Sequence, residues 1–343
     1  MTSIITSRRA VLGAAGGLLA GVGRPAQAQS GGLVLATFGG PYEDILRKQN
    51  ILSDFDRANN TQTRMEFGSG TTFIQRMLAS RMRSPYSVIY LNEDEALVGE
   101  EANLFAPLQP GRVPNLSQIY DQLKPPAVHM YGTMFFELTC VYNSSTMPEP
   151  KSWADLWKPG VRVGVCHPTN AYGLLFLQVA AELAGHSGER LSDGFPMIKK
   201  LENYKLYRGV VDGIQLFRQG EIDAALFYRN RAIQLADEGF PIKHTAPKEG
   251  AFGIRSGVQV ARTTPNQDLA FRWVNNAMSA PYQRHFADGL YSPANKTVEL
   301  PPELAAKHIY GEAELNKLRF LDWSNINRQK QELYARWDRE FAR

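Results

Sequence analysis

The 343-residue sequence lacks the short motifs that mark most hydrolases, metalloenzymes and nucleotide-binding enzymes. It has no Cys-x-x-Cys pair, His-Glu-x-x-His helix, glycine-rich phosphate loop or Gly-x-Ser-x-Gly elbow. Its six histidines are scattered with no spacing suited to a metal. We therefore expect no catalytic residues, no metal site and no cofactor, and we do not expect an enzyme.

Cysteine is also scarce. The two cysteines, Cys140 and Cys166, each lie in an apolar run that is typical of a strand. One disulfide between them and two buried free thiols are both compatible with this pattern.

The first 28 residues contain a paired arginine (Arg8 and Arg9), an uncharged apolar run and a small-x-small site, in that order. This order predicts a secretory signal peptide of the twin-arginine type over residues 1–28. The apolar run is short and rich in Gly and Ala, which disfavours a membrane anchor, and an uncleaved helix is the alternative. We expect a mature chain that begins near Gln29 and is soluble in a bacterial periplasm.

An excess of positive charge disappears with that segment. The whole chain has 38 basic and 34 acidic residues, and three arginines leave with the signal, so the mature chain carries 35 against 34. A nearly neutral chain does not predict a surface for nucleic acid or another polyanion.

Predicted strands and helices alternate through the first third of the mature chain. Strands "GLVLATFGG", "TRMEFGSG" and "YSVIYLN" are separated by helices, one of which is expected to run unbroken over residues 41–59, and a further helix begins at about Glu93. This alternation predicts a parallel sheet whose strand carboxyl ends open onto one crevice. Near the other end of the chain, residues 266–289 also read as one amphipathic helix.

Two apolar runs are long enough to cross between two lobes, near Phe135–Val141 and Phe252–Val258. We therefore predict an α/β fold of two lobes, each a mostly parallel sheet flanked by helices, joined by two crossover hinge strands. The expected division is lobe 1 over 29–136, lobe 2 over 137–254, and a return to lobe 1 with C-terminal helices over 255–343.

Five segments together resemble a known family: "TFGGPYED", "SWADLWKPG", "LFRQGEIDAALFY", "EGAFGIRSGVQVA" and "GLYSPANK". In this order they resemble the periplasmic solute-binding proteins of ABC importers, specifically the spermidine/putrescine-binding branch. The resemblance implies the type II periplasmic-binding-protein fold and closure about a hinge on a small-molecule solute. It also implies a monomer that delivers the solute to an ABC permease in the inner membrane.

The sequence departs from that branch where its amine pocket is formed. The resemblance implies acidic residues in a loop of the second lobe and on the returning hinge strand. Here the loop is "HPTNAYG", with no acid, and the strand has "GIRS", with Gly253 and Arg255 in place of an aromatic residue and an acid. The reversed charge predicts an anionic group on the solute, bound by the planar guanidinium of Arg255. The alternative is an ion pair with a protein carboxylate, such as Glu249 or a helix residue.

Two helix starts are further candidate anion contacts, because free backbone amides and the helix dipole favour negative charge there. Ordinary helix capping and a tight glycine turn are the alternative explanations. The candidates are Thr37, Phe38, Gly39, Gly40 and Tyr42 in the first lobe, and Thr169, Asn170 and Tyr172 in the second.

Asn92, Glu93 and Asp94 follow the third strand, where a carboxylate could bind a ligand amine; acids in a first helical turn are also favoured without any ligand. Tyr228 and Arg229 end a buried strand of the second lobe. The family resemblance implies that Tyr228 belongs to an aromatic wall of the cleft. Arg229 is either a second anion contact or a surface charge together with Arg231.

The leading hypothesis is a periplasmic binding component of an ABC importer for a small anionic or zwitterionic solute of the carboxylate, amino acid or aminophosphonate type. A polyamine binder that uses Glu93 and Asp94 is one alternative. A ferric-ion binder is another, although the chain has no adjacent tyrosine pair. An enzyme on the same scaffold is a third, because a triad assembled only in space leaves no motif.

Overall fold

The computed structural model describes residues 32–80, 83–125 and 128–341; the predicted signal peptide lies outside them. Among the described residues, no helix combines the length and the apolar character needed to cross a membrane. The strands are β1 (Val34–Thr37), β2 (Arg64–Phe67), β3 (Val88–Asn92), β4 (Tyr131–Asn143), β5 (Arg162–Cys166), β6 (Asn203–Tyr207), β7 (Ala224–Tyr228), β8 (Ile242–Thr245), β9 (Phe252–Val260) and β10 (Ser292–Pro293). The α-helices are α1 (Pro41–Lys48), α2 (Ile51–Asn59), α3 (Gly70–Ala79), α4 (Glu93–Glu101), α5 (Ala171–Leu183), α6 (Phe195–Ile198), α7 (Val210–Arg218), α8 (Arg229–Asp237), α9 (Gln267–Ala277), α10 (Ala280–Ala287), α11 (Pro302–Ala305), α12 (Glu312–Leu315) and α13 (Trp323–Phe341). Short 3-10 helices are η1 (Pro110–Arg112), η2 (Pro114–Gln118), η3 (Asp121–Leu123), η4 (Trp153–Trp157) and η5 (Leu191–Gly194).

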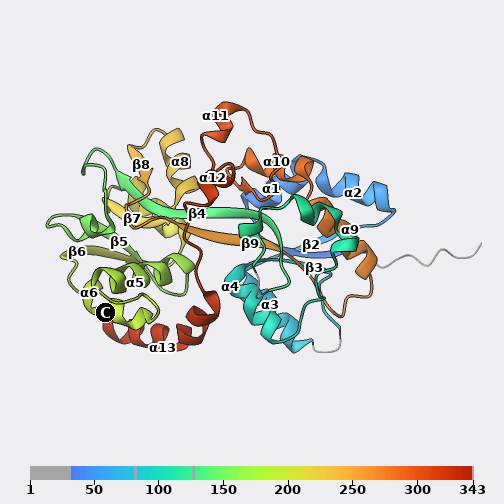
Figure 1. Ribbon diagram of the computed structural model, residues 1–343, viewed down its shortest axis with the longest axis horizontal. Helices are drawn as coiled ribbons and strands as arrows, with labels where there is room; N and C mark the ends of the chain where they lie inside the picture. The colour runs from blue at the N-terminus through green and yellow to red at the C-terminus, as the bar shows by residue number, and fades with distance from the viewer. Residues whose placement is uncertain (1–31, 81–82, 126–127, 342–343) are drawn as a thin grey trace, which may run out of the picture. The chain divides into compact units, whose positions relative to one another are not determined.

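One sheet runs through the structure in the order β2-β1-β3-β9-β4-β7-β5-β6, and β8 and β10 pair with β4 (Figure 1). The first half-sheet, β2-β1-β3, is parallel, and so is the second half-sheet, β7-β5-β6. Between them β9 and β4 pair antiparallel to each other and to the flanking strands β3 and β7. This architecture confirms the predicted α/β class with two crossover strands.

The crossover strands are buried because the sheet and its helices cover both of their faces. Phe135, Leu138 and Cys140 of β4 are each at most 1% exposed. Cys140 and Cys166 are both free thiols, and burial raises the pKa of each, to about 12 for Cys166. The two cysteines therefore act as apolar core residues, which is one of the two alternatives that the sequence left open.

Two helices predicted as single are each broken in two. Residues 41–59 form α1 and α2, because Asn50 takes a left-handed conformation with φ 55°. Residues 266–289 form α9 and α10, because Ser279 caps a new helix by accepting a hydrogen bond from Tyr282 N, and Pro281 lies in its first turn. In both places a polar residue ends the helix, although the apolar residues continue at helical spacing through the break.

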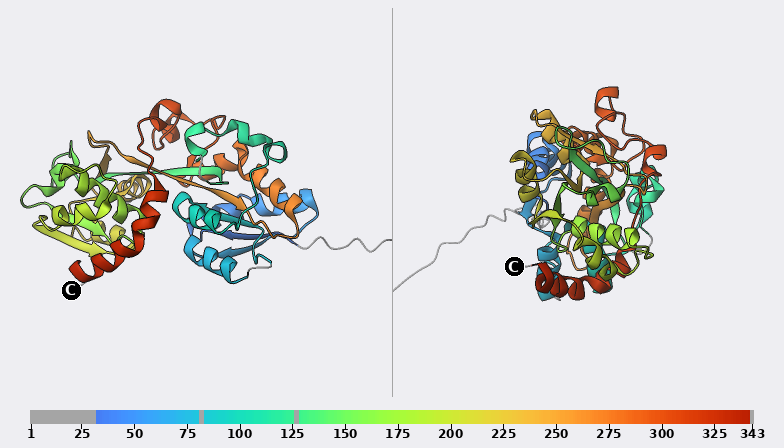
Figure 2. Two further views of the ribbon diagram at one scale, coloured as in Figure 1. Left: turned by 60° about the horizontal axis from the view of Figure 1, so that its bottom comes forward. Right: turned by 90° about the vertical axis from the view of Figure 1, so that its left-hand side faces the viewer.

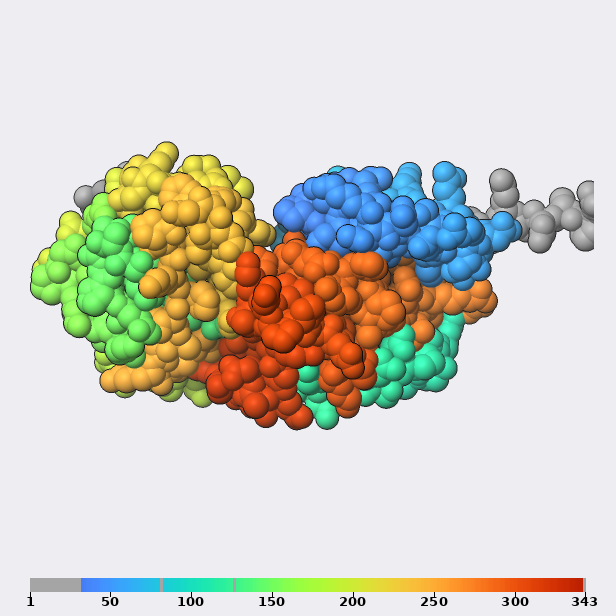
Figure 3. All heavy atoms as spheres, turned by 90° about the horizontal axis from the view of Figure 1, so that it is seen from above, coloured from blue at the N-terminus to red at the C-terminus, as the bar shows by residue number. Residues whose placement is uncertain are grey.

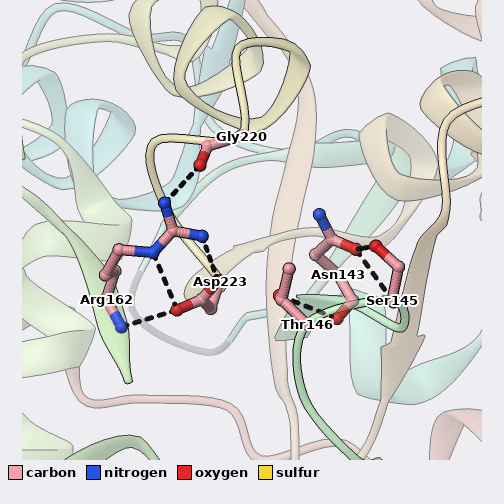
Figure 4. Close-up of polar contacts among 6 residues, drawn as sticks. All are labelled: Asn143, Ser145, Thr146, Arg162, Gly220 and Asp223. Carbon is pink, nitrogen blue, oxygen red and sulfur yellow. Dashed lines mark hydrogen bonds and ion pairs between the residues drawn. The ribbon is translucent and has the colours of Figure 1, made fainter. Parts of the chain in front are cut away.

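An ion pair fixes the second half-sheet where β5 and β7 begin. The Asp223 carboxylate accepts hydrogen bonds from the backbone nitrogen of Arg162 at 2.8 Å and from its Nε at 3.1 Å (Figure 4). Burial raises the pKa of Asp223, but the hydrogen bonds from Arg162 outweigh this and hold it below its usual range. Close by, the side chain of Asn143 accepts hydrogen bonds from Ser145 and closes the turn after β4.

The C-terminal helix α13 packs against η5 and also contacts α4 of the first half-sheet (Figure 2). Trp337 and Phe341 enter the core beside Phe195. The predicted division of the chain at residues 136 and 254 stays a prediction, and α13 is an element that contacts the helices of both half-sheets.

Candidate functional site

A cavity of about 220 Å³ opens between the first turns of α1, α7 and α8. Figure 3 shows the space between α1, in blue, and α7 and α8, in yellow. Its lining residues are Phe38, Gly39, Pro41, Asn92, Phe136, Val210, Tyr228, Asn230, Arg231 and Tyr291. We call this cavity the pocket.

The pocket lies where parallel strands end and helices begin. Phe38 follows β1, Asn92 ends β3 and Tyr228 ends β7, so three strand carboxyl ends meet there as expected for an open α/β sheet. The turn into α1 needs glycine at Gly40, whose φ is 66°. Helix starts around one cavity favour a ligand that carries negative charge.

Aromatic rings form one wall of the pocket. Phe136 meets Tyr228 edge to face with ring centroids 5.8 Å apart, and it meets Tyr291 at 5.7 Å. Phe38 packs edge-on against Tyr42 at 5.7 Å. The wall offers apolar area and ring faces to the carbon skeleton of a solute.

A buried tyrosine network supports this wall from behind. Tyr282 shares hydrogen bonds with Tyr42 at 3.1 Å and Tyr90 at 2.8 Å, and Trp273 Nε1 donates to Tyr90 at 2.9 Å. Burial raises the pKa of all three phenols, to about 12 for Tyr90, so they stay neutral. The network ties α1 to α9 and α10 and holds Tyr42 beside Phe38.

Arg231 is the cation of the pocket. Its Nη1 donates to Gln234 at 3.0 Å, and no described carboxylate forms an ion pair with it. Burial raises the pKa of the neighbouring Tyr291 phenol, and the positive charge of Arg231 opposes that rise. Beside it, Asn230 donates to the Leu290 carbonyl at 3.4 Å, and its own Oδ1 has no hydrogen-bond partner. The pocket thus contains an uncompensated positive charge and an unused acceptor.

Arg255 lies elsewhere. Its Nη1 donates to Glu93 at 2.7 Å and its Nε donates to the Gln122 carbonyl at 2.6 Å, with the two charged side chains only 13% and 8% exposed. It is not among the residues that line the pocket. Burial raises the pKa of Glu93, and Arg255 opposes that rise. The geometry matches the alternative of an internal ion pair, and the partner is a helix residue, Glu93 of α4, rather than Glu249. The ligand role of Arg255 stays a prediction.

The glycine at 253 is explained by the same group. A Cβ at Gly253 would lie 2.3 Å from the ring of Phe320, so only glycine leaves room for that ring. Phe320 in turn stacks under the Arg255 guanidinium, 4.1 Å from ring centroid to Cζ. Gly253 and Arg255 of the segment "GIRS" therefore pack together with Phe320, which lies 67 residues after Gly253 in the chain.

The other charged candidates are also paired within the chain. Arg229 bonds Glu137 of β4 at 3.1 Å, and Asp94 bonds Lys330 of α13 at 2.8 Å. Glu95 accepts from Asn92 N at 3.2 Å, and its burial raises its pKa to about 7. The acids after β3 thus have cationic or backbone partners of their own.

The remaining candidates lie outside the pocket lining. Thr37 is fully buried, and Tyr172 is buried against Tyr228 with ring centroids 5.5 Å apart. Thr169 bonds His167 at 2.9 Å, and Asn170 donates to the Arg208 carbonyl. These contacts fit the capping and turn explanations, and a ligand role for each stays a prediction.

The structure therefore brings four predicted residues to the pocket: Phe38, Gly39, Asn92 and Tyr228. Sequence reasoning treated Arg231 only as a surface charge and did not propose Phe136, Val210, Asn230 or Tyr291. The position of Arg231 could have indicated a ligand contact, because it lies in the first helical turn after β7, as Arg229 does. Among the described residues, no group of three or more His, Cys, Asp and Glu side chains could hold a metal ion.

Comparisons with known proteins identify the family and the fold. Residues 50–311 match the family described as bacterial extracellular solute-binding protein. The spermidine/putrescine-binding periplasmic protein of Escherichia coli K12 is 24% identical over 189 residues, and the chain spans about half the length (53%) of that relative.

Solved structures share the fold over almost the whole chain. A crystal structure of an ABC transporter from Clostridium perfringens matches with a TM-score of 0.78 and 25% identity, over 90% of this chain and 99% of the other. The binding protein MotA of A. tumefaciens B6, in complex with glucopine, matches with a TM-score of 0.71 and 16% identity, over 90% and 99%.

Proposed function

The chain belongs to the bacterial extracellular solute-binding protein family, and we propose that it captures a small anionic or zwitterionic organic solute in the pocket for an ABC importer. The solute class is carboxylate, amino acid or aminophosphonate. Closure of the two half-sheets about β4 and β9 would complete the contacts around it. The family and the similar structures are solute-binding proteins rather than enzymes.

The observation that carries the proposal is the uncompensated charge of Arg231 in the pocket. A guanidinium keeps its charge at any physiological pH and binds a carboxylate or phosphonate through two parallel hydrogen bonds. Helix starts around the pocket add to the positive field, and the aromatic wall packs the carbon skeleton. The glucopine complex of the A. tumefaciens protein is compatible with this, although at 16% identity it supports the fold more than the ligand.

A polyamine is the second candidate, because the curated relatives are named for spermidine and putrescine. Binding a diamine requires free carboxylates. Glu93 and Asp94, the acids that directly follow the lining residue Asn92, are paired with Arg255 and Lys330. We therefore place the anionic solute first.

Partner and location follow from the same proposal. We propose that the loaded protein delivers its solute to an inner-membrane ABC permease, acts as a monomer in the periplasm, and reaches that compartment by the twin-arginine route.

A thermal-shift screen of the purified protein tests the solute class. The panel contains dicarboxylates, aromatic acids, amino acids, ω-amino acids, phosphonates, putrescine and spermidine. A ligand at about 100 times its Kd adds roughly 2.7 kcal/mol to the unfolding free energy, which is easily measured. We expect shifts with acids or zwitterions and none with diamines.

Two matched variants test the role of the pocket cation. Arg231→Gln removes that cation. The control, Arg218→Gln, removes a partly exposed arginine in the last turn of α7 that pairs with Glu238. We expect Arg231→Gln to lower the affinity for the best acid by about 100-fold, since truncating one partner of a buried charge pair costs about 2–5 kcal/mol. Arg218→Gln should leave it unchanged. Diamines as the best ligands, or full affinity in Arg231→Gln, would overturn the proposal.

A further inference from the structure

Lys330 of α13 holds its ammonium group at the start of α4, on the carboxylate of Asp94. The Nζ–Oδ2 distance is 2.8 Å, and the two side chains are only 18% and 16% exposed. Asn327, one turn earlier on α13, donates to the Asp94 carbonyl at 2.8 Å. Asp94 is two residues beyond Asn92, which lines the pocket.

An aromatic ring lies beside this ion pair. The Lys330 ammonium lies 5.8 Å from the ring centroid of Trp323. Burial raises the pKa of Tyr228 and of Tyr334, and the nearby charge of Asp94 raises both further. Tyr228 also lines the pocket, so the charge of Asp94 acts on a residue of the pocket wall. A carboxylate and an aromatic ring on either side of one ammonium group form the kind of environment that binds an amine.

The position of Lys330 is fixed by the packing of its helix. One residue before it, Gln329 accepts from Leu191 N at 3.0 Å and donates to the Glu189 carbonyl at 2.8 Å. Arg336 donates to the Ser192 carbonyl at 3.0 Å, and the nearby Trp337 is buried in the core. The ammonium is therefore held beside Asp94 by a docked helix.

We propose that Lys330 is a specificity-determining residue, whose tethered ammonium fills the amine-binding position beside Asp94. The cleft then offers a free cation at Arg231 and no free carboxylate at Asp94. The solute selected is accordingly net negative, of the dicarboxylate or phosphonate class, with no amine directed at α4. This inference rests on the proposed function and narrows its solute class.

Removing the ammonium tests the proposal directly. In Lys330→Ala the carboxylate of Asp94 loses its cation and a space opens beside it. We expect the melting temperature of Lys330→Ala to fall and to recover with ethylammonium at about 10 mM, but not with ethanol at the same concentration. The double variant Lys330→Ala/Asp94→Asn should show no recovery, because the carboxylate is gone.

A second variant keeps the test decisive if Lys330→Ala does not fold. Lys330→Gln preserves the length of the side chain and can still donate to Asp94, yet leaves the negative charge uncompensated. Calorimetry should show affinity for ω-amino acids or putrescine raised by about tenfold over the parent protein. The exposed variant Lys317→Gln, whose lysine pairs with Glu314 and is not among the residues that line the pocket, should show no gain.

The outcomes separate the two proposals. If the parent protein binds no acid but Lys330→Ala is rescued by ethylammonium, the proposed function fails and the amine position stands. If the parent binds acids and neither Lys330 variant gains an amine response, the inference about Lys330 is wrong. An equal response in the variant that also carries Asp94→Asn overturns it as well.

Discussion

The two sides of the pocket differ in how their charges are balanced. On the α7–α8 side, Arg231 has no carboxylate partner among the described residues and Asn230 has an unused acceptor oxygen. On the α4 side, Glu93 pairs with Arg255 and Asp94 pairs with Lys330, each within 2.8 Å. The first side can bind a ligand charge at no internal cost, whereas the second must first break an ion pair.

This difference shows that the presence of a charged residue near a cleft does not establish its availability to a ligand. Removing one partner of a buried pair leaves a charge that is desolvated and unpaired, at a cost of about 3–5 kcal/mol. A ligand that competed for Glu93 or Asp94 would have to overcome a cost of that kind. The predictions below test this contrast, starting from the largest expected effect.

The largest effect is expected from Arg255→Met. The variant strands the buried carboxylate of Glu93, so we expect the unfolding free energy to fall by about 3–5 kcal/mol, measured by urea denaturation. The double variant Arg255→Met/Glu93→Gln should recover most of this loss, because no charge is left unpaired. Affinity for the best acid should change little in the double variant. A loss of affinity as large as that of Arg231→Gln would instead make Arg255 a ligand contact.

The second effect concerns pH and Glu95. Its pKa is about 7 in the folded protein, because burial raises it above its ordinary value of 4.5. Between these values the unfolded chain releases the proton while the folded protein keeps it, so this group lowers the stability as pH rises from about 4.5 to 7. We expect Glu95→Gln to flatten the fall in melting temperature over that interval. An unchanged slope would show that Glu95 ionises normally.

The sequence predicts features that depend on neighbouring residues better than features that depend on residues far apart in the chain. The strands and the two crossovers follow from local apolar periodicity, and the pocket residues Phe38 and Asn92 follow from the rule that strand ends meet at a crevice. The break at Asn50 rests on one left-handed residue inside a continuous apolar pattern, which periodicity does not register. β6 has four exposed residues and β8 has an exposed lysine, so neither shows the apolar run of a buried strand.

The charge pairings could not be predicted, because they join residues far apart in the chain. Arg255 and Glu93 are 162 positions apart, and Lys330 and Asp94 are 236 apart. Sequence reasoning offered Glu249 or an unspecified helix residue for Arg255, and Glu249 instead accepts from Ser152 and from Trp153 N. Only the fold decides which arginine finds an acid, and hence that Arg231 rather than Arg255 faces the pocket.

A smaller effect is expected from Asn230→Ala on the open side of the pocket. Asn230 lines the pocket and its buried Oδ1 has no hydrogen-bond partner, and one neutral hydrogen bond contributes about 0.5–1.5 kcal/mol. We expect the affinity for the best acid to fall about two- to tenfold by calorimetry, with the melting temperature of the unliganded protein unchanged. A large loss of stability with full affinity would mean that Asn230 serves the fold instead.

The smallest effect is expected from Phe320→Leu on the closed side. Leucine keeps the packing against Gly253 but removes the ring that stacks on Arg255 at 4.1 Å, and a cation–π contact is worth about 0.5–2 kcal/mol. If the ring stabilises the protein through the guanidinium, its loss should cost less once Arg255 is already methionine. A double-mutant cycle of Phe320→Leu with Arg255→Met, measured by urea denaturation, gives this coupling free energy. A coupling of zero would mean that Phe320 only fills the space above Gly253, and that the ion pair with Glu93 alone keeps Arg255 from the pocket.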